Sequence, residues 1–295
     1  MNVLVSGAGG LIGKALSERL RQRGDKVTAL TREATGPDQI EWDPSVPVRD
    51  RRPYEGFDAV VHLAGESIMG RWTEEKRESI CDSRVQGTTH LALALALLSS
   101  PPRVFVCASA IGWYGDRGCE ILTEDSPEGS GFLAEVSRKW EESCKPAAEA
   151  GIRVVNTRFG IVLSEEGGAL KAMLPAFRLG LGGRLGSGKQ WWSWVALDDA
   201  VAALIYAIDT PGLRGPVNIT APEPLRNDDF TRTLARKLHR TAFFPVPTFA
   251  LHLTLGRQAA DELLLASARV IPGRLAASGF DFHHKTLPDA LASIL

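Results

Sequence analysis

Short apolar runs alternate with stretches of helical periodicity through the first half of this chain. The apolar runs are continuous and not interrupted by alternating polar residues, which is typical of strands that are buried on both faces of a parallel sheet. The runs lie at Val3 to Val5, Lys26 to Thr31, Asp58 to Leu63, Arg103 to Ala108 and Ile152 to Thr157. The helical stretches lie at Leu11 to Leu20, Thr73 to Leu98 and Phe132 to Ala150. This order predicts an α/β fold, a doubly wound parallel sheet with helices on both faces.

The second half of the chain has weaker periodicity and more breaks. Gly180 to Gly188 predicts a flexible loop, Leu197 to Ile208 a helix, and Pro211 to Pro224 a series of turns. Asn227 or Asp228 is expected to cap a helix that runs to His239. We therefore divide the chain into a main domain of residues 1–240, with insertions near 165–195 and 220–240, and a smaller C-terminal α/β lobe of residues 241–295.

The most specific local pattern is a glycine turn near the start of the chain. Gly7, Gly10 and Gly13 lie between the first apolar run and a helix that opens with Leu11 and Ile12. The first glycine permits a tight turn, the second lets backbone approach a phosphate, and the third lets the helix pack closely on the strand. A strand, a glycine turn and a helix N-terminus in this order predict a Rossmann-type site for a dinucleotide pyrophosphate. The alternative is a glycine-rich turn that binds nothing.

The end of the second apolar run bears on which dinucleotide is bound. An acidic residue at this point would hold the ribose 2′-hydroxyl of NAD. This chain has Thr31 and Arg32 instead, and a guanidinium can bind a 2′-phosphate with two parallel hydrogen bonds. We therefore predict NADP(H) as the cofactor. Glu33 follows one residue later and is the alternative, since it would take the part of the acid.

Composition and charge exclude several classes of function. Hydrophobic residues make up 44% and charged residues 23%, and the formal net charge is −1, so neither nucleic acid nor an anionic membrane is an expected partner. The longest apolar run, Leu91 to Leu98, is too short to span a bilayer. The six His and four Cys show no metal-ligand spacing, so no metal site is expected. A strand follows Met1 almost at once, so no signal peptide is expected. The four cysteines are scattered without a C-x-x-C pair, which predicts reduced or buried thiols in a cytoplasmic protein.

Three further motifs resemble the extended branch of the short-chain dehydrogenase/reductase superfamily, which contains the sugar-nucleotide epimerases. Asp58 to Gly65 is similar to its third-strand motif, Arg84 to Thr88 to its helix motif, and Ser109 to Gly115 to the segment that carries its catalytic serine. The resemblance implies a Rossmann-type domain with a nicotinamide cofactor. We expect further cofactor contacts from Leu63, Ala64, Gly65, Arg84 and Ile161.

A combination of motifs along nearly the whole chain is similar to one subgroup of that branch, the atypical "epimerase family proteins" with a small C-terminal domain of unknown function. The similar segments are His62 to Glu66, Trp140-Glu141, Gly180 to Gly188 and Arg269 to Leu275. Together they are far more specific than the glycine turn alone.

The chain departs from this branch at the residues that perform the chemistry. Typical members place a Tyr, and a Lys four residues later, on one helix face, where the Lys lowers the pKa of the phenol so that it exchanges a proton during hydride transfer. By register against Trp140-Glu141, Phe132 stands at the Tyr position and Val136 at the Lys position. Arg84 also replaces the usual Asn, so only Ser109 remains of the four catalytic residues.

Three residues are candidates for a catalytic role. Ser109 either hydrogen-bonds a substrate oxygen or the nicotinamide, or is a satisfied hydroxyl at a strand end. Tyr114 either serves as a displaced acid or is a packing residue. Glu66 is a general base, a ribose ligand, or a helix-capping or solvated carboxylate. For Arg84, a cofactor or substrate contact competes with a structural salt bridge.

Aromatic residues in the second half and one histidine have simpler interpretations. Trp191, Trp192 and Trp194 either form the wall of a substrate pocket or, as is more common for alternating aromatic residues, pack on one face of a strand. His62 lies inside an apolar run and is predicted to be buried and hydrogen-bonded.

Two functions remain open at this stage. One is an NADP(H)-dependent oxidoreductase or epimerase with a non-standard proton donor and an unidentified small-molecule substrate. The other is an NADP(H)-responsive binding protein without turnover. A structural remnant that binds nothing is the third alternative. A homodimer is a candidate assembly.

Overall fold

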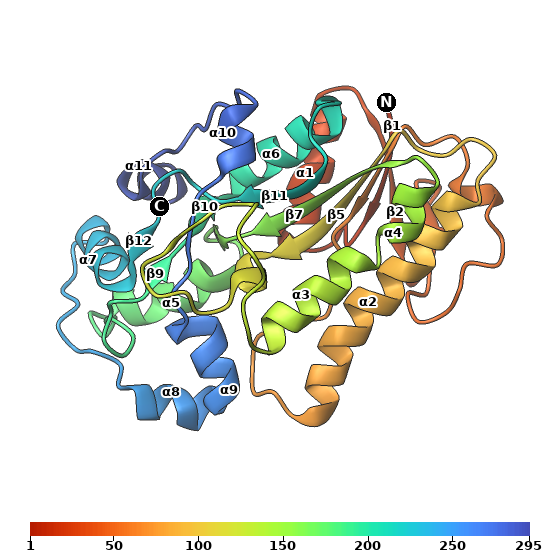
Figure 1. Cartoon of the computed structure of the whole chain (residues 1–295). Coiled ribbons are helices and arrows are strands. Elements are labelled where there is room, and N and C mark those ends of the chain that lie inside the picture. The colour runs from red at the N-terminus through yellow and green to blue at the C-terminus, as the bar shows by residue number, and fades with distance from the viewer.

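The computed structural model describes all of residues 1–295 and contains a seven-stranded sheet in which every neighbouring pair is parallel (Figure 1). The strand order is β11-β7-β5-β4-β1-β2-β3. In chain order the strands are β1 (Asn2–Ser6), β2 (Lys26–Thr31), β3 (Gln39–Glu41), β4 (Ala59–His62), β5 (Val104–Ala110), β7 (Arg153–Phe159) and β11 (Gly215–Ile219). The predicted Rossmann-type doubly wound fold is confirmed.

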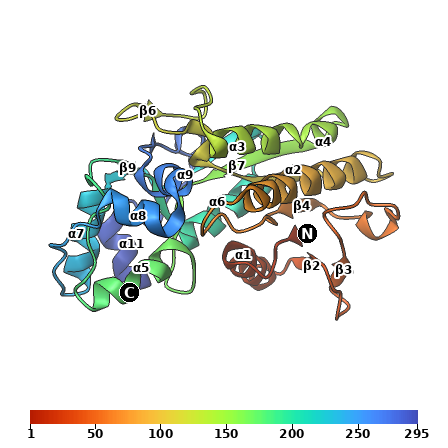
Figure 2. The same cartoon turned by 90° about the horizontal axis from the view of Figure 1, so that it is seen from below.

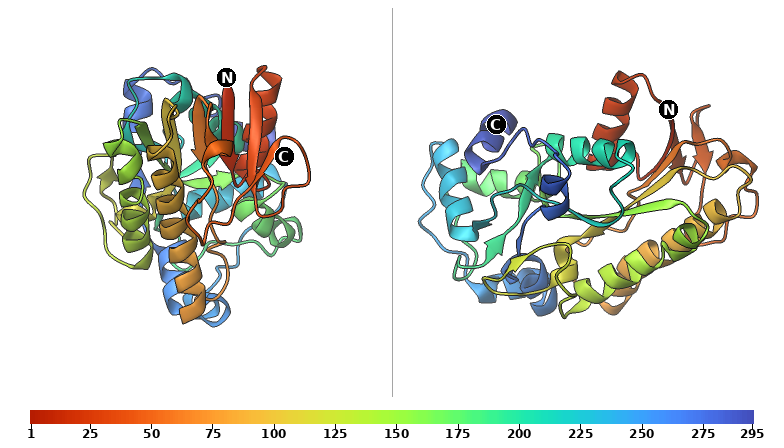
Figure 3. Two further views of the ribbon diagram at one scale, coloured as in Figure 1. Left: turned by 90° about the vertical axis from the view of Figure 1, so that its right-hand side faces the viewer. Right: turned by 45° about the horizontal axis from the view of Figure 1, so that its top comes forward.

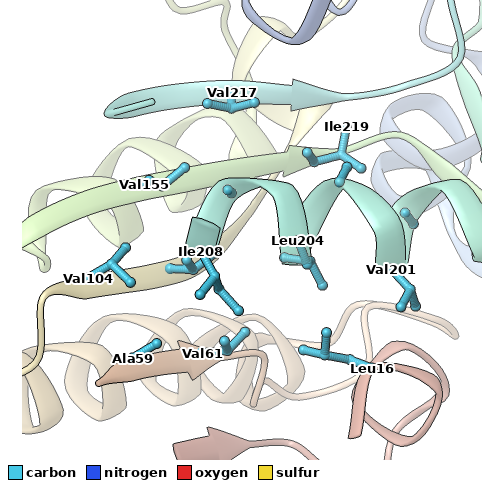
Figure 4. Close-up of a cluster of buried hydrophobic side chains, with 14 of the residues drawn as sticks. Leu16, Ala59, Val61, Val104, Val155, Val201, Leu204, Ile208, Val217 and Ile219 are labelled. Atoms are coloured by element: carbon cyan, nitrogen blue, oxygen red, sulfur yellow. The ribbon is translucent and has the colours of Figure 1, made fainter. Parts of the chain in front are cut away.

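Helices cover both faces of this sheet, as Figure 2 shows from below. One face packs on α1 (Leu11–Gln22) and α6 (Leu197–Asp209), and the other on α2 (Glu74–Ala96), α3 (Phe132–Glu142) and α4 (Lys145–Glu149). Alternate strand residues point to opposite faces. Val61 and Val104 therefore join the core under α1 and α6 (Figure 4), as does Val3, while Leu4 and Val60 join the core under α2 and α3.

Three local predictions differ from the structure. The helix expected from Phe132 to Ala150 is interrupted between α3 and α4, and Pro146 lies in the first turn of α4. Pro211 to Pro224 was expected to form only turns, but it contains β11. That strand lies at the sheet edge, where Pro216 removes no ladder hydrogen bond that the sheet needs. The short edge strand β3 was not predicted.

A layer of short elements, most of them from the second half of the chain, lies beside the sheet. Its strands are β6 (Ile121–Leu122), β8 (Ile161–Leu163), β9 (Trp191–Trp192), β10 (Trp194–Ala196), β12 (Leu225–Arg226) and β13 (Arg269–Val270), and its helices include α5 (Gly168–Arg178) and α7 (Asn227–Lys237). The predicted cap of α7 is wrong. The side chain of Asn227 accepts a hydrogen bond from the backbone N–H of Leu185 instead, and the N-cap residue Arg226 makes no side-chain cap.

Residues 241–295 are mainly helical and cross the molecule. They begin with α8 (Thr248–Leu255), α9 (Arg257–Ala260) and the π-helical turn η3 (Asp261–Leu265), and end with β13, α10 (Gly273–Ala277) and α11 (Leu287–Ile294). In Figure 1 and in the right-hand view of Figure 3 this blue segment starts with α8 near the lower edge and ends at the upper left. It adds Leu275 to the core under α6, and Leu291 to the core around Trp192. None of the helices combines the length and apolarity that a membrane span requires.

Candidate functional site

The glycine turn after β1 has the close backbone packing that its residues predict. Gly7 has φ +71°, and a Cβ there would lie 2.8 Å from the backbone of Leu63 and Ala64. A Cβ on Gly13 would lie 2.1 Å from the carbonyl oxygen of Gly7. Gly10 is the N-cap of α1 and makes no side-chain cap, so the first backbone N–H groups of the helix face the turn. The turn therefore fits a dinucleotide pyrophosphate, which would bind to these N–H groups.

The residues that follow Gly10 support this cradle from the helix side. Leu11 packs against Gly167, just before α5, and Ile12 packs on the core under α1. Ile161 begins β8 directly after the sheet strand β7 and pairs with Trp194. These contacts place Leu11, Ile12 and Ile161, which were predicted to contact the cofactor, at one edge of the sheet. The pairing with Trp194 also gives Ile161 a structural role.

The end of β2 carries a polar turn beside the glycine cradle. The hydroxyl of Thr31 accepts a hydrogen bond from the backbone N–H of Glu33 at 3.0 Å, and Arg32 is exposed without an ion pair. A cavity of about 360 Å³ lies next to this turn and is lined by Gly9, Lys14 and Thr31 among others. Lys14 was missed in the sequence, although a cation directly after Gly13 was a usable signal. Lys14 lines this cavity, and Arg32 directly follows the lining residue Thr31.

Arg84 connects α2 to the loop after β4. Its Nη1 donates to the carbonyl oxygens of Glu66, at 3.0 Å, and Ile80, at 3.1 Å, and its guanidinium lies 5.0 Å from the Trp140 ring centroid. Burial lowers the pKa of Arg84 to about 10. The predicted alternative of a structural salt bridge is wrong in detail, because carbonyl groups and an aromatic face hold this cation. The guanidinium lies directly under Gly65, on the floor of the predicted cofactor site.

Glu66 forms an ion pair with Lys76 of α2 at the same edge of the sheet. The hydrogen bond from Lys76 lowers the pKa of the Glu66 carboxyl group. The side chain is 37% exposed, so the carboxylate is open to a ligand. It is, however, a weaker base than an unpaired glutamate, since the ammonium stabilises its charged form.

Ser109 is held by a buried ion pair. Its hydroxyl donates to Glu141 Oε1 at 2.7 Å. Glu141 also accepts two hydrogen bonds from Arg158, one from Nε at 2.7 Å and one from Nη2 at 2.9 Å. The side chain of Arg158 is only 2% exposed. This geometry matches the prediction of a satisfied strand-end hydroxyl.

Tyr114 belongs to the same network and is fully buried. Its hydroxyl donates to Asn218 Oδ1 at 2.7 Å and accepts from Arg158 Nη1 at 3.0 Å. Burial raises the pKa of the phenol. Because both hydrogen-bonding directions of the hydroxyl are used inside the protein, the structure supports the packing interpretation over that of a displaced acid.

The face of α3 that packs against the end of β5 carries no tyrosine. The side chains against Gly112, which follows β5, are Leu133 and Ser137, one position later than the register against Trp140-Glu141 suggests. Phe132 instead packs edge-on against Trp72, with ring centroids 5.1 Å apart, and Val136 is buried. In either register α3 carries no Tyr, so the usual proton relay is absent.

A carboxylate from the C-terminal segment reaches this helix and was missed in the sequence. Glu262 of η3 accepts hydrogen bonds from the backbone N–H groups of Phe132, at 3.1 Å, and Leu133, at 2.8 Å, at the N-terminus of α3. Gly131 allows this approach, since a Cβ there would lie 3.1 Å from the Glu262 carboxyl carbon. The partners are far apart in sequence and share no local motif, so no sequence signal identified the pair.

The structure also places His62 and the three neighbouring tryptophans of the second half. His62 is fully buried between the hydroxyl groups of Ser6 and Thr88, as predicted, and burial lowers its pKa to about 4. Trp192 and Trp194 lie in the core, whereas Trp191 is half-buried and borders a surface cavity. The chain has no cluster of three His, Cys, Asp or Glu side chains that could hold a metal ion.

These features define a nucleotide-binding domain of the Rossmann class with an altered catalytic face. The family model described as "NAD dependent epimerase/dehydratase family" matches residues 3–219, and the one described as "Domain of unknown function (DUF1731)" matches residues 246–294. The chain therefore belongs to the NAD dependent epimerase/dehydratase family.

Two relatives of nearly equal length are named epimerase family proteins. An epimerase family protein of Mycobacterium tuberculosis is 40% identical over 291 residues, which cover 98% of this chain and 96% of that protein. Human epimerase family protein SDR39U1 is 36% identical over 299 residues and is matched over the full length of both chains.

Two solved structures share the fold at similar identity. A crystal structure of human SDR39U1 with NADPH superposes with a TM-score of 0.92 at 35% identity, covering 100% of this chain and 99% of that one. A nucleoside-diphosphate sugar epimerase from Corynebacterium glutamicum superposes with a TM-score of 0.84 at 37% identity, covering 100% of this chain and 58% of that one.

Proposed function

We propose that this chain binds NADP(H) at the carboxyl edge of the sheet. The carrying observation is the backbone cradle at Gly7 and Gly13, where no Cβ fits and the N-terminus of α1 faces the turn. Arg32 and Lys14 would hold the 2′-phosphate, because neither cation has an ion-pair partner. The human relative with 35% identity was crystallised with NADPH, which supports this assignment.

The reaction that fits this site best is reduction of a small carbonyl compound, or the reverse oxidation. Bound NADPH would supply a hydride at the nicotinamide. A carbonyl that accepts a hydride also needs a proton, which typical members of the superfamily deliver from the Tyr–Lys pair. In this chain Ser109 and Tyr114 are engaged with Glu141, Arg158 and Asn218. Water is therefore the proton donor in this proposal, and the side chains only bind and orient the substrate.

A second function is favoured by the same hydrogen bonds. A site in which the Ser109 and Tyr114 hydroxyl groups are both satisfied by the protein is suited to holding NADP(H) without turnover. Glu262 in addition connects the C-terminal segment to α3, beside the end of β5 where the nicotinamide would lie. This arrangement suits a protein that passes the redox state of the bound nucleotide to a partner.

A pH series with matched glycine variants separates the two functions. The protein is mixed with NADPH and a panel of aldehydes and ketones, and loss of the reduced nicotinamide is followed by its absorbance. The oxidoreductase predicts turnover that rises steadily as pH falls, without the plateau that a titrating enzymic acid produces. Gly13→Val must abolish this turnover, and Gly9→Ala must retain it, because a Cβ on Gly9 meets nothing within 4 Å. Tight NADPH binding without turnover on any compound would instead establish the binding protein.

A further inference from the structure

The four short strands β12, β9, β13 and β6 place a row of side chains side by side. Arg226 of β12 pairs directly with Trp191 of β9. The neighbouring segment is joined to β9 by the hydrogen bond from Ala268 N–H to the Trp191 carbonyl. Arg269 of β13 in turn pairs with Ile121 of β6. The resulting order across this layer is Arg226, Trp191, Arg269 and Ile121.

This row faces away from the protein core. Side chains alternate between the two faces of a strand. Trp192, Leu122 and Val270 are buried, with exposed fractions of 6%, 0% and 0%. Their neighbours Trp191 and Ile121 therefore project to the opposite face, and Ile121 is 52% exposed.

The row borders a cavity of about 350 Å³. Its apolar wall is made by Pro222, Pro224, Leu225 and Ile271, together with Ile121 and the indole of Trp191. None of these residues comes from the glycine turn or from the loops after β4 and β5. The cavity is therefore separate from the cofactor site. Its volume is at the lower end of the range for small-molecule sites.

Two cations of this cavity have no anionic partner in the protein. The guanidinium carbons of Arg269 and Arg226 lie 4.3 Å and 5.4 Å from the Trp191 ring centroid, and neither group makes an ion pair or a hydrogen bond. Of the two carboxylates in the lining, Asp229 is paired with Arg232, and Glu223 accepts no hydrogen bond from either arginine. Trp191 Nε1 is also buried without a partner.

We propose that this cavity binds a small organic oxyanion, a carboxylate or a phosphate monoester joined to a flat apolar group. The two guanidinium groups would hold the oxyanion, since their planar donors match both carboxylate and phosphate. Trp191, already stacked with both cations, would contact the apolar group together with the proline and isoleucine wall. The site lies outside the cofactor cleft, so its ligand would be a second one, distinct from the nucleotide at the glycine turn.

Calorimetric titration of the full-length protein with four probes tests this site. Benzoate, phenyl phosphate, inorganic phosphate and uncharged benzyl alcohol are titrated in the presence of saturating NADPH, so that the cofactor site is already filled. The two anions that carry an apolar group are benzoate and phenyl phosphate. We expect at least one of the two anions to bind and benzyl alcohol to bind at least about tenfold more weakly. Absence of binding by both anions overturns the proposal. So does binding of inorganic phosphate as tight as that of phenyl phosphate, because the apolar wall would then contribute nothing.

Charge-matched variants locate the binding. Arg269→Gln and Arg226→Gln should each weaken the anion at least about tenfold, whereas Arg103→Gln, which removes an 85% exposed cation of the sheet domain, should leave it unchanged. Wild-type affinity for NADPH shows that a variant is folded. If one of the two variants loses NADPH affinity, anion binding by the other variant tests the proposal. Undiminished anion binding by a folded Arg269→Gln or Arg226→Gln protein overturns the assignment.

Discussion

Two regions at the same edge of the sheet differ in what builds them. The turn between β1 and α1 is made of backbone, and its key residues matter for the Cβ atoms they lack. The region between β5 and α3 is made of side chains, and Ser109 and Tyr114 there bind other protein groups. A fold of this class can therefore keep a backbone cradle for a nucleotide while the neighbouring Ser109 and Tyr114 hydroxyl groups are bound by other protein groups.

The largest effect is expected in the backbone-built region. Gly13→Val places side-chain atoms where even a Cβ would lie 2.1 Å from the Gly7 carbonyl oxygen. We expect NADPH affinity to fall at least about a hundredfold, with a lower melting temperature, because α1 must move off β1. Titration of NADPH fluorescence measures the loss. Gly9→Ala is the control and should bind normally. Equal affinity of both variants would contradict the cradle.

Substitutions in the region between β5 and α3 should change the free energy of unfolding. Glu141→Gln leaves Arg158 buried without its charged partner, which typically costs about 3–5 kcal/mol in free energy of unfolding. The neighbouring Glu142→Gln removes only an exposed partner of Arg138 and should change stability far less. Urea unfolding measures both. A stable Glu141→Gln protein that binds NADPH but loses turnover would reverse the comparison and make the network catalytic.

His62, at the end of β4, predicts a pH dependence of stability. Its pKa is about 4 in the folded protein and 6.5 when unperturbed, so the unfolded chain binds a proton that the folded one rejects between these values. Stability from this group is present above pH 6.5 and is lost as pH falls. Between pH 7 and 5 the loss is about 2 kcal/mol.

Urea unfolding of His62→Gln and His90→Gln at both pH values isolates this contribution. His62→Gln should flatten the dependence by that amount. The half-buried His90, whose ring bonds only the Pro44 carbonyl, serves as the control, and its variant should keep the dependence. An unchanged slope in His62→Gln would show that another group titrates.

The smallest effect concerns the choice of cofactor. Arg32→Gln should weaken NADPH about tenfold and leave NADH unchanged, because only NADPH carries the 2′-phosphate. Arg49→Gln, another exposed cation of the same domain, is the control. Competitive titration with both nucleotides measures the ratio. A parallel loss of NADH affinity would place Arg32 at a part of the nucleotide that both cofactors share.

Whether a prediction was correct depended on whether its signal lay in contiguous residues or in residues far apart in the sequence. The glycine turn, the buried strands and the burial of His62 are each indicated by a pattern of contiguous residues, so the sequence was sufficient to predict them. Strand β11 was missed because Pro216 is tolerated only at a sheet edge, and edge position is set by the order of all seven strands. The cap of α7 was wrong because Asn227 found a partner at Leu185, 42 residues earlier.

The amino-acid sequence was sufficient to predict the doubly wound sheet and the glycine turn for a dinucleotide, because the strand, the glycines and the helix of that turn are contiguous in the chain. It also determined that α3 carries no Tyr. The groups that Ser109 and Tyr114 bind could be found only from the three-dimensional packing, since their partners Glu141 and Asn218 lie 32 and 104 residues away. That packing alone placed Glu262 on α3 and brought Arg226 and Arg269 onto Trp191. Partners of this kind depend on how distant elements pack, and local periodicity contains no record of that packing.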